Sequence, residues 1–374
     1  QWTALIDALK HDKNVYVTML NGTHIDSVGP DTISRWLEFL DIYVAGRVPS
    51  ANPLLPALAS AVYSEATGGA PSAAPPAVRF TNEPSLSAAQ AAFAAQDPRV
   101  RVLFDNGGGS LGPGALQPTY EGDFSTWPPA GSTVRYSLGP EGTLATSRTR
   151  GASTTSFLPN PAVRPADDLS SSANAWAAQP PYNWTTVPAA NGIAFETPVF
   201  TQATTFVGPA SLDLELESTA AVTDLQVTVT EVEPGAAKEE YITSGFLRSS
   251  YRGLSSASTA LDPVPSYLAS SQRDLPHGRF ALVRIPVDPI AHTFRPGTRM
   301  RIVISAPGGD RPSWAFDTPA TNDKVRDTVA IGGAKRSSFV IDEVTGVDAT
   351  VGLPACGSLR GEPCRSYSPL GNQT

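Results

Sequence analysis

The clearest strand-turn-helix pattern in the chain is NVYVTMLNGTHIDSVGPDTISRWLEFLDIYVAGR, from Asn14 to Arg47. Val15 to Leu20 is a short run rich in β-branched residues, which is typical of a strand covered on both faces. Asn21-Gly22 ends this run with a turn. Apolar residues then recur at helical spacing, namely at Ile33, Trp36, Leu37, Leu40 and Val44. This pattern predicts an amphipathic helix that begins at Pro30-Asp31 and ends at Gly46.

One histidine, His24, lies in the turn between the predicted strand and helix. In α/β-hydrolases the general base is a histidine at such a place, and the nucleophile and the acid precede it in the sequence. His24 is therefore a candidate catalytic residue. Only 23 residues precede it, so we expect the chain to begin between the acid and the histidine of such a domain. Asp26 is interpreted as a turn or cap residue, because it lies too close along the turn to orient the ring.

Length and composition restrict the classes of protein to which the chain can belong. Its 374 residues suggest about two domains, or one large domain with attachments. The net charge of −8 argues against nucleic acid as a partner. No run of about 18 apolar residues is present, so no membrane-spanning helix is expected. The 35 prolines and 31 glycines lie among strand-like runs and favour a mainly β body.

The region after residue 98 shows the period of two that is typical of antiparallel strands. Apolar and polar residues alternate around Leu212 to Leu216, Leu225 to Val229, Phe280 to Val287 and Met300 to Ile304. Two Ala-rich helices are predicted earlier, at 57–66 and 85–96. We therefore divide the chain into 1–97, an incomplete α/β-type domain with connecting helices, 98–345, a β-sandwich, and 346–374, a tail.

The two cysteines, Cys356 and Cys364, lie close together in this tail. Without neighbouring histidines they form a poor metal site, and a local disulfide is the favoured interpretation. A disulfide would indicate an oxidising compartment, which for this chain means secretion, the periplasm or the cell surface. Two free thiols are the alternative. The sequence predicts neither a cofactor nor a metal.

Other candidate motifs are weaker. Gly108 to Gly112 formally matches G-x-S-x-G, but no helical pattern follows and it comes after His24, so it is predicted to be a loop of the sandwich. His11-Asp12 resembles a metal-dependent phosphohydrolase pair but lacks the further ligands. His292 is interpreted as structural, and four arginines as solvent-facing or interdomain ion-pair residues: Arg248, Arg252, Arg299 and Arg301.

Short motifs in a fixed order resemble the C-terminal half of the cocaine-esterase and X-prolyl dipeptidyl-peptidase (CocE/NonD) group of serine hydrolases. They are the His24 turn with Trp36 to Leu40, Val100 to Val102, Trp127-Pro128-Pro129, Tyr136 to Leu138, Phe195 to Pro198, Val207 to Pro209, Thr223-Asp224, Gly245 to Arg248, and His292 to Gly297. Many members carry Gly-Pro-Trp before the catalytic histidine, whereas this chain has Asn21-Gly22-Thr23.

The resemblance implies an α/β-hydrolase domain followed by a jelly-roll β-sandwich. It implies that His24 is the general base of a serine hydrolase that cleaves a small ester or amide through an acyl-enzyme, as dipeptidyl-peptidases and acylases do. The partner would be an N-terminal catalytic segment or chain that carries the serine and the acid. A non-catalytic β-sandwich module for binding or assembly is the alternative.

Overall fold

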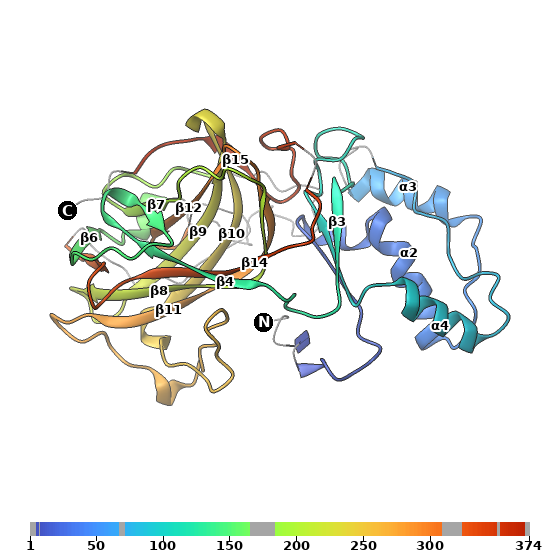
Figure 1. Cartoon of the computed structure of the whole chain (residues 1–374), viewed down its shortest axis with the longest axis horizontal. Coiled ribbons are helices and arrows are strands. Elements are labelled where there is room, and N and C mark those ends of the chain that lie inside the picture. Colours follow the sequence, from blue (N-terminus) through green and yellow to red (C-terminus); the bar gives the residue numbers. More distant parts are fainter. Residues whose placement is uncertain are drawn as a thin grey trace. The chain divides into compact units, whose positions relative to one another are not determined.

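The computed structural model describes residues 5–6, 8–66, 72–164, 184–308, 324–349 and 352–370 (Figure 1). The chain divides into two compact units. The N-terminal unit includes Gln1–Ala130 and Gly346–Pro363, and the β unit includes Gly131–Ala173, Pro181–Thr345 and Cys364–Thr374.

The N-terminal unit contains a three-stranded sheet of β1 (Val17–Leu20), β2 (Val100–Phe104) and β3 (Tyr120–Phe124), in that order. β1 is parallel to β2, and β2 is antiparallel to β3. This pairing moves the unit boundary from the predicted residue 97 to residue 130. The sequence alone could not place it there, because β2 resembles the strands of the β unit until its pairing with β1 is known.

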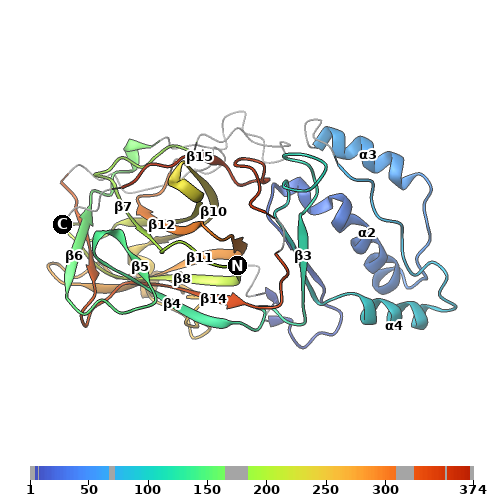
Figure 2. The ribbon, with the colours of Figure 1, turned by 45° about the horizontal axis from the view of Figure 1, so that its top comes forward.

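Helical segments make the crossover that a parallel pair of strands requires. They are η1 (His24–Val28), α2 (Pro30–Phe39), η2 (Leu40–Val44), α3 (Leu55–Ala66) and α4 (Leu86–Gln96). The labelled helices α2, α3 and α4 lie on one side of the three-stranded sheet in both views (Figures 1 and 2). Both predicted Ala-rich helices are confirmed as α3 and α4. Among the described helices, none combines the length and the hydropathy that a membrane crossing requires.

The helix α2 buries its polar side and exposes part of its apolar side. The Arg35 guanidinium donates to the Val17 carbonyl at 3.1 Å and to Thr18 Oγ1 at 2.7 Å, and it pairs with Asp97 at 2.9 Å. Glu38, which is 1% exposed, pairs with Arg79 at 2.6 Å. On the apolar side, by contrast, Trp36 is 54% exposed and Val44 of η2 is 71% exposed. The outer side of this helix is therefore an apolar surface.

The β unit is a large antiparallel sheet in the order β5-β4-β14-β8-β11-β10-β9-β12-β7, with β13, β6 and β15 paired off this path. The ranges are β4 (Ser132–Leu138), β5 (Leu144–Ala145), β6 (Ser153–Phe157), β7 (Gly192–Glu196), β8 (Thr204–Ser218), β9 (Asp224–Val232), β10 (Lys238–Arg248), β11 (Ala281–Phe294), β12 (Arg299–Ser305), β13 (Asp327–Ile331), β14 (Ser338–Val344) and β15 (Cys364–Ser366). The sheet curves into two layers (Figure 2). The predicted mainly β fold is confirmed.

The predicted alternation places one apolar row from each long strand in the core of this unit. Leu212, Leu214 and Leu216 of β8 and their counterparts on β9, β11 and β12 are fully buried. The opposite side of β9 is also buried, although one buried face per strand was expected. Its polar residues bond to one another, as Gln226 Nε2 does to Thr228 Oγ1 at 2.9 Å, so burial there leaves these groups satisfied.

Asp327, at the start of β13, is a buried carboxylate of the β unit that titrates at an unusual pH. It is 0% exposed, and burial raises its pKa from 3.8 to about 6, although hydrogen bonds from the Ser218 and Thr223 hydroxyls oppose the shift. The folded state therefore binds this proton more tightly than the unfolded state does. The resulting stabilisation is complete below pH 3.8 and is lost as the pH rises through about 6.

We expect Asp327→Asn to raise the free energy of unfolding at pH 7.5 by about 1–3 kcal/mol and to give no gain at pH 4. The reason is that asparagine stays neutral where the wild-type carboxylate must be charged and buried. Urea denaturation at pH 4, 6 and 7.5 measures the difference. Asp348→Asn, at an exposed position, is the control and should change stability little at any of these pH values. An equal gain for Asp327→Asn at all three pH values would refute the explanation.

Candidate active-site turn

The turn after β1 carries His24 and is shaped by the residues before it. Gly22 has φ +151°, and a Cβ at this position would lie 2.2 Å from Asp26 Oδ2. Only glycine therefore fits there. Thr23 then caps the short helix η1, because its backbone N–H and its hydroxyl both donate to the Asp26 carboxylate, at 3.0 and 3.1 Å. His24 is the first residue of η1.

Asp26 is a structural residue of this turn, as predicted. It is 1% exposed, and in addition to the Thr23 cap it accepts two hydrogen bonds from Arg360, to Oδ2 at 2.8 Å and to Oδ1 at 2.7 Å. Asn106 Nδ2 donates to Oδ2 at 3.3 Å. These bonds use both carboxylate oxygens to hold the turn together.

The His24 side chain is exposed, in contrast to the buried carboxylate two residues later. It follows the carboxyl end of β1, which is the end of a strand where α/β proteins place their active sites. Ser27 is also exposed, and its hydroxyl donates to the His24 carbonyl at 2.8 Å. The turn therefore exposes His24 on a backbone whose conformation is held by the hydrogen bonds of Asp26. The catalytic role of His24 stays a prediction.

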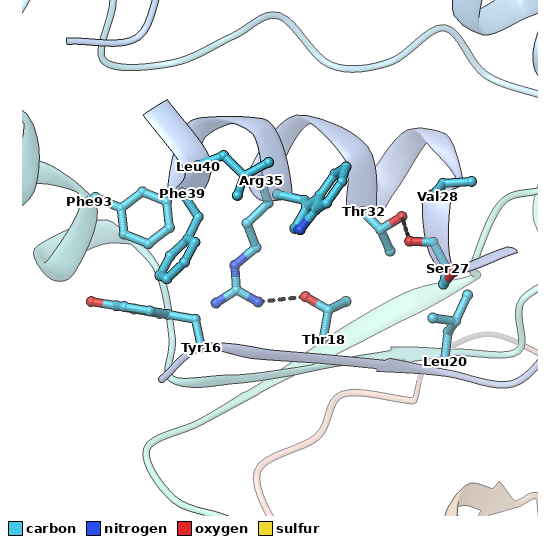
Figure 3. Close-up of a pocket in the computed structure, with 11 residues that line it drawn as sticks. Tyr16, Thr18, Leu20, Ser27, Val28, Thr32, Arg35, Phe39, Leu40 and Phe93 are labelled. Atoms are coloured by element: carbon cyan, nitrogen blue, oxygen red, sulfur yellow. Dashed lines mark hydrogen bonds between the residues drawn. The ribbon is translucent and has the colours of Figure 1, made fainter. Parts of the chain in front are cut away.

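A groove runs along β1 close to this turn (Figure 3). Its volume is about 520 Å³, and its floor is formed by Thr18 and Leu20 of β1 and by Tyr16, which directly precedes this strand. Its wall is formed by Arg35, Trp36 and Phe39 of α2 and by Leu40 of η2, and Phe93 of α4 closes one end. Figure 3 shows the Arg35 guanidinium pointing down to Thr18. Among the strands that the structure describes, β1 lies at one edge of its three-stranded sheet, to which a further strand can be added.

The G-x-S-x-G segment, Gly108 to Gly112, lies in the loop between β2 and β3. This loop belongs to the N-terminal unit and not to the sandwich, which corrects the predicted location. No helix follows it before β3 at Tyr120, as predicted. Ser110 is exposed, and Gln117 Oε1 accepts the backbone N–H of Leu111 at 3.0 Å. The segment has the geometry of a turn-rich loop and not of a nucleophile elbow.

The other histidines are of two kinds. His11 and His277 are exposed. His292 is 3% exposed, and its Nε2 lies 2.8 Å from Glu231 Oε2 inside the β unit. Burial alone would raise the pKa of Glu231, but His292, with further help from Thr298 and Arg295, holds that pKa below its ordinary value. The structural interpretation of His292 is confirmed.

The arginines of the β unit differ from the prediction in two cases. Arg252 is half-buried, and its guanidinium donates to the backbone carbonyls of Ser249, at 3.1 Å, and Asp274, at 2.7 Å, with no carboxylate partner among the described residues. Arg248 pairs with Asp224 at 2.9 Å and Arg299 with Glu196 at 3.3 Å, with partly exposed side chains. Arg301 is only 1% exposed and pairs with Glu239 at 2.7 Å. Arg301, on β12, is therefore a core residue. Its burial is possible because Glu239, on β10, supplies the compensating negative charge.

Cys356 and Cys364 are disulfide-bonded, as predicted. The segment between them carries Arg360, the partner of Asp26. No sequence pattern predicts this pair, because 334 residues separate the two. An arginine inside a disulfide-closed segment is a weak sequence signal for this pair. Neither Asn21, in the turn, nor Asn106, which follows β2, gives any signal.

The sequence from residue 91 to residue 341 matches the family described as the X-Pro dipeptidyl-peptidase C-terminal non-catalytic domain. The match covers more than half of the chain. The chain belongs to this family. His24 and its turn lie outside the matched segment, so the word non-catalytic in the family's description does not extend to them. A comparison with curated protein sequences found no match.

Solved hydrolase structures are similar to this X-Pro dipeptidyl-peptidase C-terminal domain protein. A CocE/NonD family hydrolase from Staphylococcus aureus has a TM-score of 0.51 and 15% identity, over 71% of this chain and 46% of that one. An α-amino acid ester hydrolase has a TM-score of 0.47 and 15% identity, over 67% of this chain and 41% of that one. At this identity the likeness to the first shows the fold alone. The chain spans less than half the length of these structures. The predicted resemblance to the C-terminal part of the CocE/NonD hydrolases is confirmed.

Proposed function

We propose that this chain is the C-terminal portion of a serine hydrolase in which His24 is the general base and later the general acid. The observation that carries the proposal is the exposed His24 at the carboxyl end of β1, on a turn fixed by the buried Asp26. A base must meet both the serine hydroxyl and an orienting acid, so it must project from a rigid backbone into open space. The serine and the acid belong to a catalytic segment or chain that precedes this one.

The reaction is acyl transfer to the serine followed by hydrolysis. Nε2 of His24 accepts the hydroxyl proton as the serine attacks the carbonyl, and the same proton then goes to the leaving alcohol or amine. Water repeats the sequence on the acyl-enzyme. The substrate class is a small ester or amide, of the kind that dipeptidyl-peptidases and acylases cleave. The disulfide favours an oxidising location, such as secretion or the periplasm.

The groove beside β1 supports a docking site for the catalytic segment. An edge strand offers unpaired backbone groups, and the exposed Trp36 offers apolar surface beside it. A strand from the catalytic segment that pairs with β1 would form hydrogen bonds with these backbone groups and cover the exposed side of Trp36. It would extend the sheet by one parallel strand and bring the catalytic serine to the end of β1 at which His24 lies.

The proposed docking predicts a large effect of Trp36→Glu in the whole protein. Burial of the exposed half of the indole contributes about 2–3 kcal/mol, and glutamate would lose this contribution. The Val17 N–H donates to the Arg99 carbonyl, on the β2 side, so the next amide and every second one along β1 face its open edge. We expect hydrogen exchange of these open-edge amides, Thr18 and Leu20, to become roughly 30- to 150-fold faster. The control is Leu282→Glu, which replaces another 50%-exposed apolar residue, on β11. Equal exchange in both variants and in the wild type would argue against docking at this groove.

The proposed function is tested by labelling the whole protein with a fluorophosphonate and locating the modified residue by mass spectrometry. We expect one modified serine, in a segment that precedes this chain, and a strong dependence on His24. Modification of Ser110, or of any other serine in this chain, would contradict the proposal.

A non-catalytic binding or assembly module is the second candidate. The observation that favours it is the family match itself, which describes a non-catalytic domain and covers most of the β unit. Failure of the whole protein to react with the fluorophosphonate would support this candidate.

A further inference from the structure

Arg360 is bound beneath the His24 turn by a buried ion pair. Its Nε and Nη2 donate to the two oxygens of Asp26 at 2.8 and 2.7 Å, which is the bidentate geometry of a strong guanidinium-carboxylate pair. The side chains of Arg360 and Asp26 are 1% and 0% exposed. The third guanidinium nitrogen, Nη1, donates to the Gly114 carbonyl at 3.1 Å. The whole head group is therefore used inside the N-terminal unit.

The backbone of Arg360 is fixed as firmly as its side chain. Its N–H donates to the Asn106 carbonyl at 2.8 Å, and its carbonyl accepts from Asn21 Nδ2 at 3.1 Å. Asn21 and Asn106 are bonded to each other as well, with the Asn106 N–H donating to Asn21 Oδ1 at 2.8 Å. The two asparagines therefore clamp the segment that carries Arg360 against the end of β1.

Close backbone contact makes this arrangement specific. Gly361, next to Arg360, has φ +73°, and a Cβ on it would lie 2.5 Å from the Gly22 carbonyl oxygen. Gly22 itself has no room for a Cβ because of Asp26. Two glycines thus let two distant chain segments meet at the turn, and the guanidinium then reaches the Asp26 carboxylate, which accepts from the N-cap residue Thr23.

We propose that Arg360 is a positioning residue for His24, acting through Asp26. The proposal rests on the proposed function, in which His24 is the base. Bidentate pairing fixes the orientation of the Asp26 carboxylate. This carboxylate accepts hydrogen bonds from Thr23, the N-cap of η1, and so fixes the start of this helix. Because His24 is the first residue of η1, the position of its side chain depends on this cap. A displacement of about 1 Å at a catalytic group can lower the rate about 100-fold. Because the Arg360–Asp26 pair positions the base and does not contact the substrate, its loss should lower kcat and leave substrate affinity unchanged.

The test compares Arg360→Met, Arg360→Lys and Arg365→Met in the whole protein. The first removes the charge, the second keeps the charge without the planar fork, and the third is a matched control. Arg365 comes from the same tail and pairs with Glu239 at 2.7 Å in the β unit. Labelling with a fluorophosphonate gives two readouts, because the final stoichiometry counts intact sites while the rate reports how well the histidine activates the serine.

We expect Arg360→Met to label to the wild-type stoichiometry at a rate lower by roughly 10- to 100-fold. Arg360→Lys should recover part of this rate, and Arg365→Met should label at the wild-type rate. Hydrogen exchange of residues 21–29 should be faster in Arg360→Met than in the wild type and in Arg365→Met. A wild-type labelling rate in Arg360→Met, or an equal loss in Arg365→Met, would overturn the proposal.

A failure of the proposed function would be seen in the labelling of the wild type and of His24→Gln, and not in the Arg360 variants. If the wild-type protein does not label at all, His24 is not the base of a serine nucleophile and the catalytic part of the inference fails with it. If the wild type labels and His24→Gln labels equally fast, the histidine is not the base. In neither case would the exchange of residues 21–29 in Arg360→Met be affected, so that measurement separately decides whether Arg360 orders the turn.

Discussion

Replacement of His24 by glutamine is expected to lower kcat for hydrolysis of a p-nitrophenyl ester by roughly 1000-fold or more in the whole protein. General acid-base catalysis contributes about 100- to 10,000-fold, and a serine hydroxyl is a poor nucleophile without a base. Glutamine keeps a side chain of similar length and polarity but cannot accept the proton. Since the His24 side chain is exposed, the fold should tolerate the change, and the melting temperature should move little.

Two matched histidines serve as controls for this prediction. His11, in the N-terminal unit, and His277, in the β unit, are exposed, as His24 is. His11→Gln and His277→Gln should keep kcat within about twofold, because surface substitutions away from a site have small effects. Initial rates at saturating substrate give kcat for all three variants. Retention of more than a tenth of the activity by His24→Gln would rule out its role as the base.

Arg301→Met is expected to lower the free energy of unfolding of the β unit by about 3–5 kcal/mol. Arg301 Nη1 lies 2.7 Å from Glu239 Oε2, and the side chains of this pair are 1% and 0% exposed. Methionine fills a similar volume but leaves a buried carboxylate with only part of its compensation. Arg365 remains, with its Nε 2.7 Å from Glu239 Oε1, which keeps the loss within this range. Urea denaturation followed by tryptophan fluorescence measures it.

Arg248→Met is the control for the buried pair. Arg248 makes two hydrogen bonds to Asp224, at 2.9 and 3.0 Å, but its side chain is 35% exposed. Solvent screens such a pair, so its loss should cost at most about 1 kcal/mol. Equal losses in the two variants would mean that burial does not set the importance of the arginine pairs in this sheet.

The sequence by itself determined the features that depend on neighbouring residues. The run from Val15 to Leu20 predicts β1, the spacing from Ile33 to Val44 predicts a helix, and Gly46 ends it with φ +66°. The alternation at Leu212 to Leu216 predicts a core strand of the β unit. Each of these is a local periodicity or a local backbone requirement, so it can be recognised without knowledge of the fold.

Only the tertiary structure decided which side of α2 is buried. Periodicity shows that the helix has an apolar side and a polar side, but not which side packs within the unit. Arg35 and Glu38 point inward because Asp97 and Arg79, far away in the sequence, neutralise them there. The unit boundary has a similar cause, since β2 joins the N-terminal unit through its pairing with β1.

The Arg360–Asp26 pair that holds the His24 turn was likewise decided by the tertiary structure. His24 is visible in the sequence because a histidine between a strand and a helix is a local pattern. Arg360 is not, because its pair with Asp26 exists only when the tail returns to the end of β1 and when Gly22 and Gly361 allow the two backbones to meet. The energy of a buried ion pair depends on complete desolvation and on a fixed partner, and both of these are properties of the folded chain.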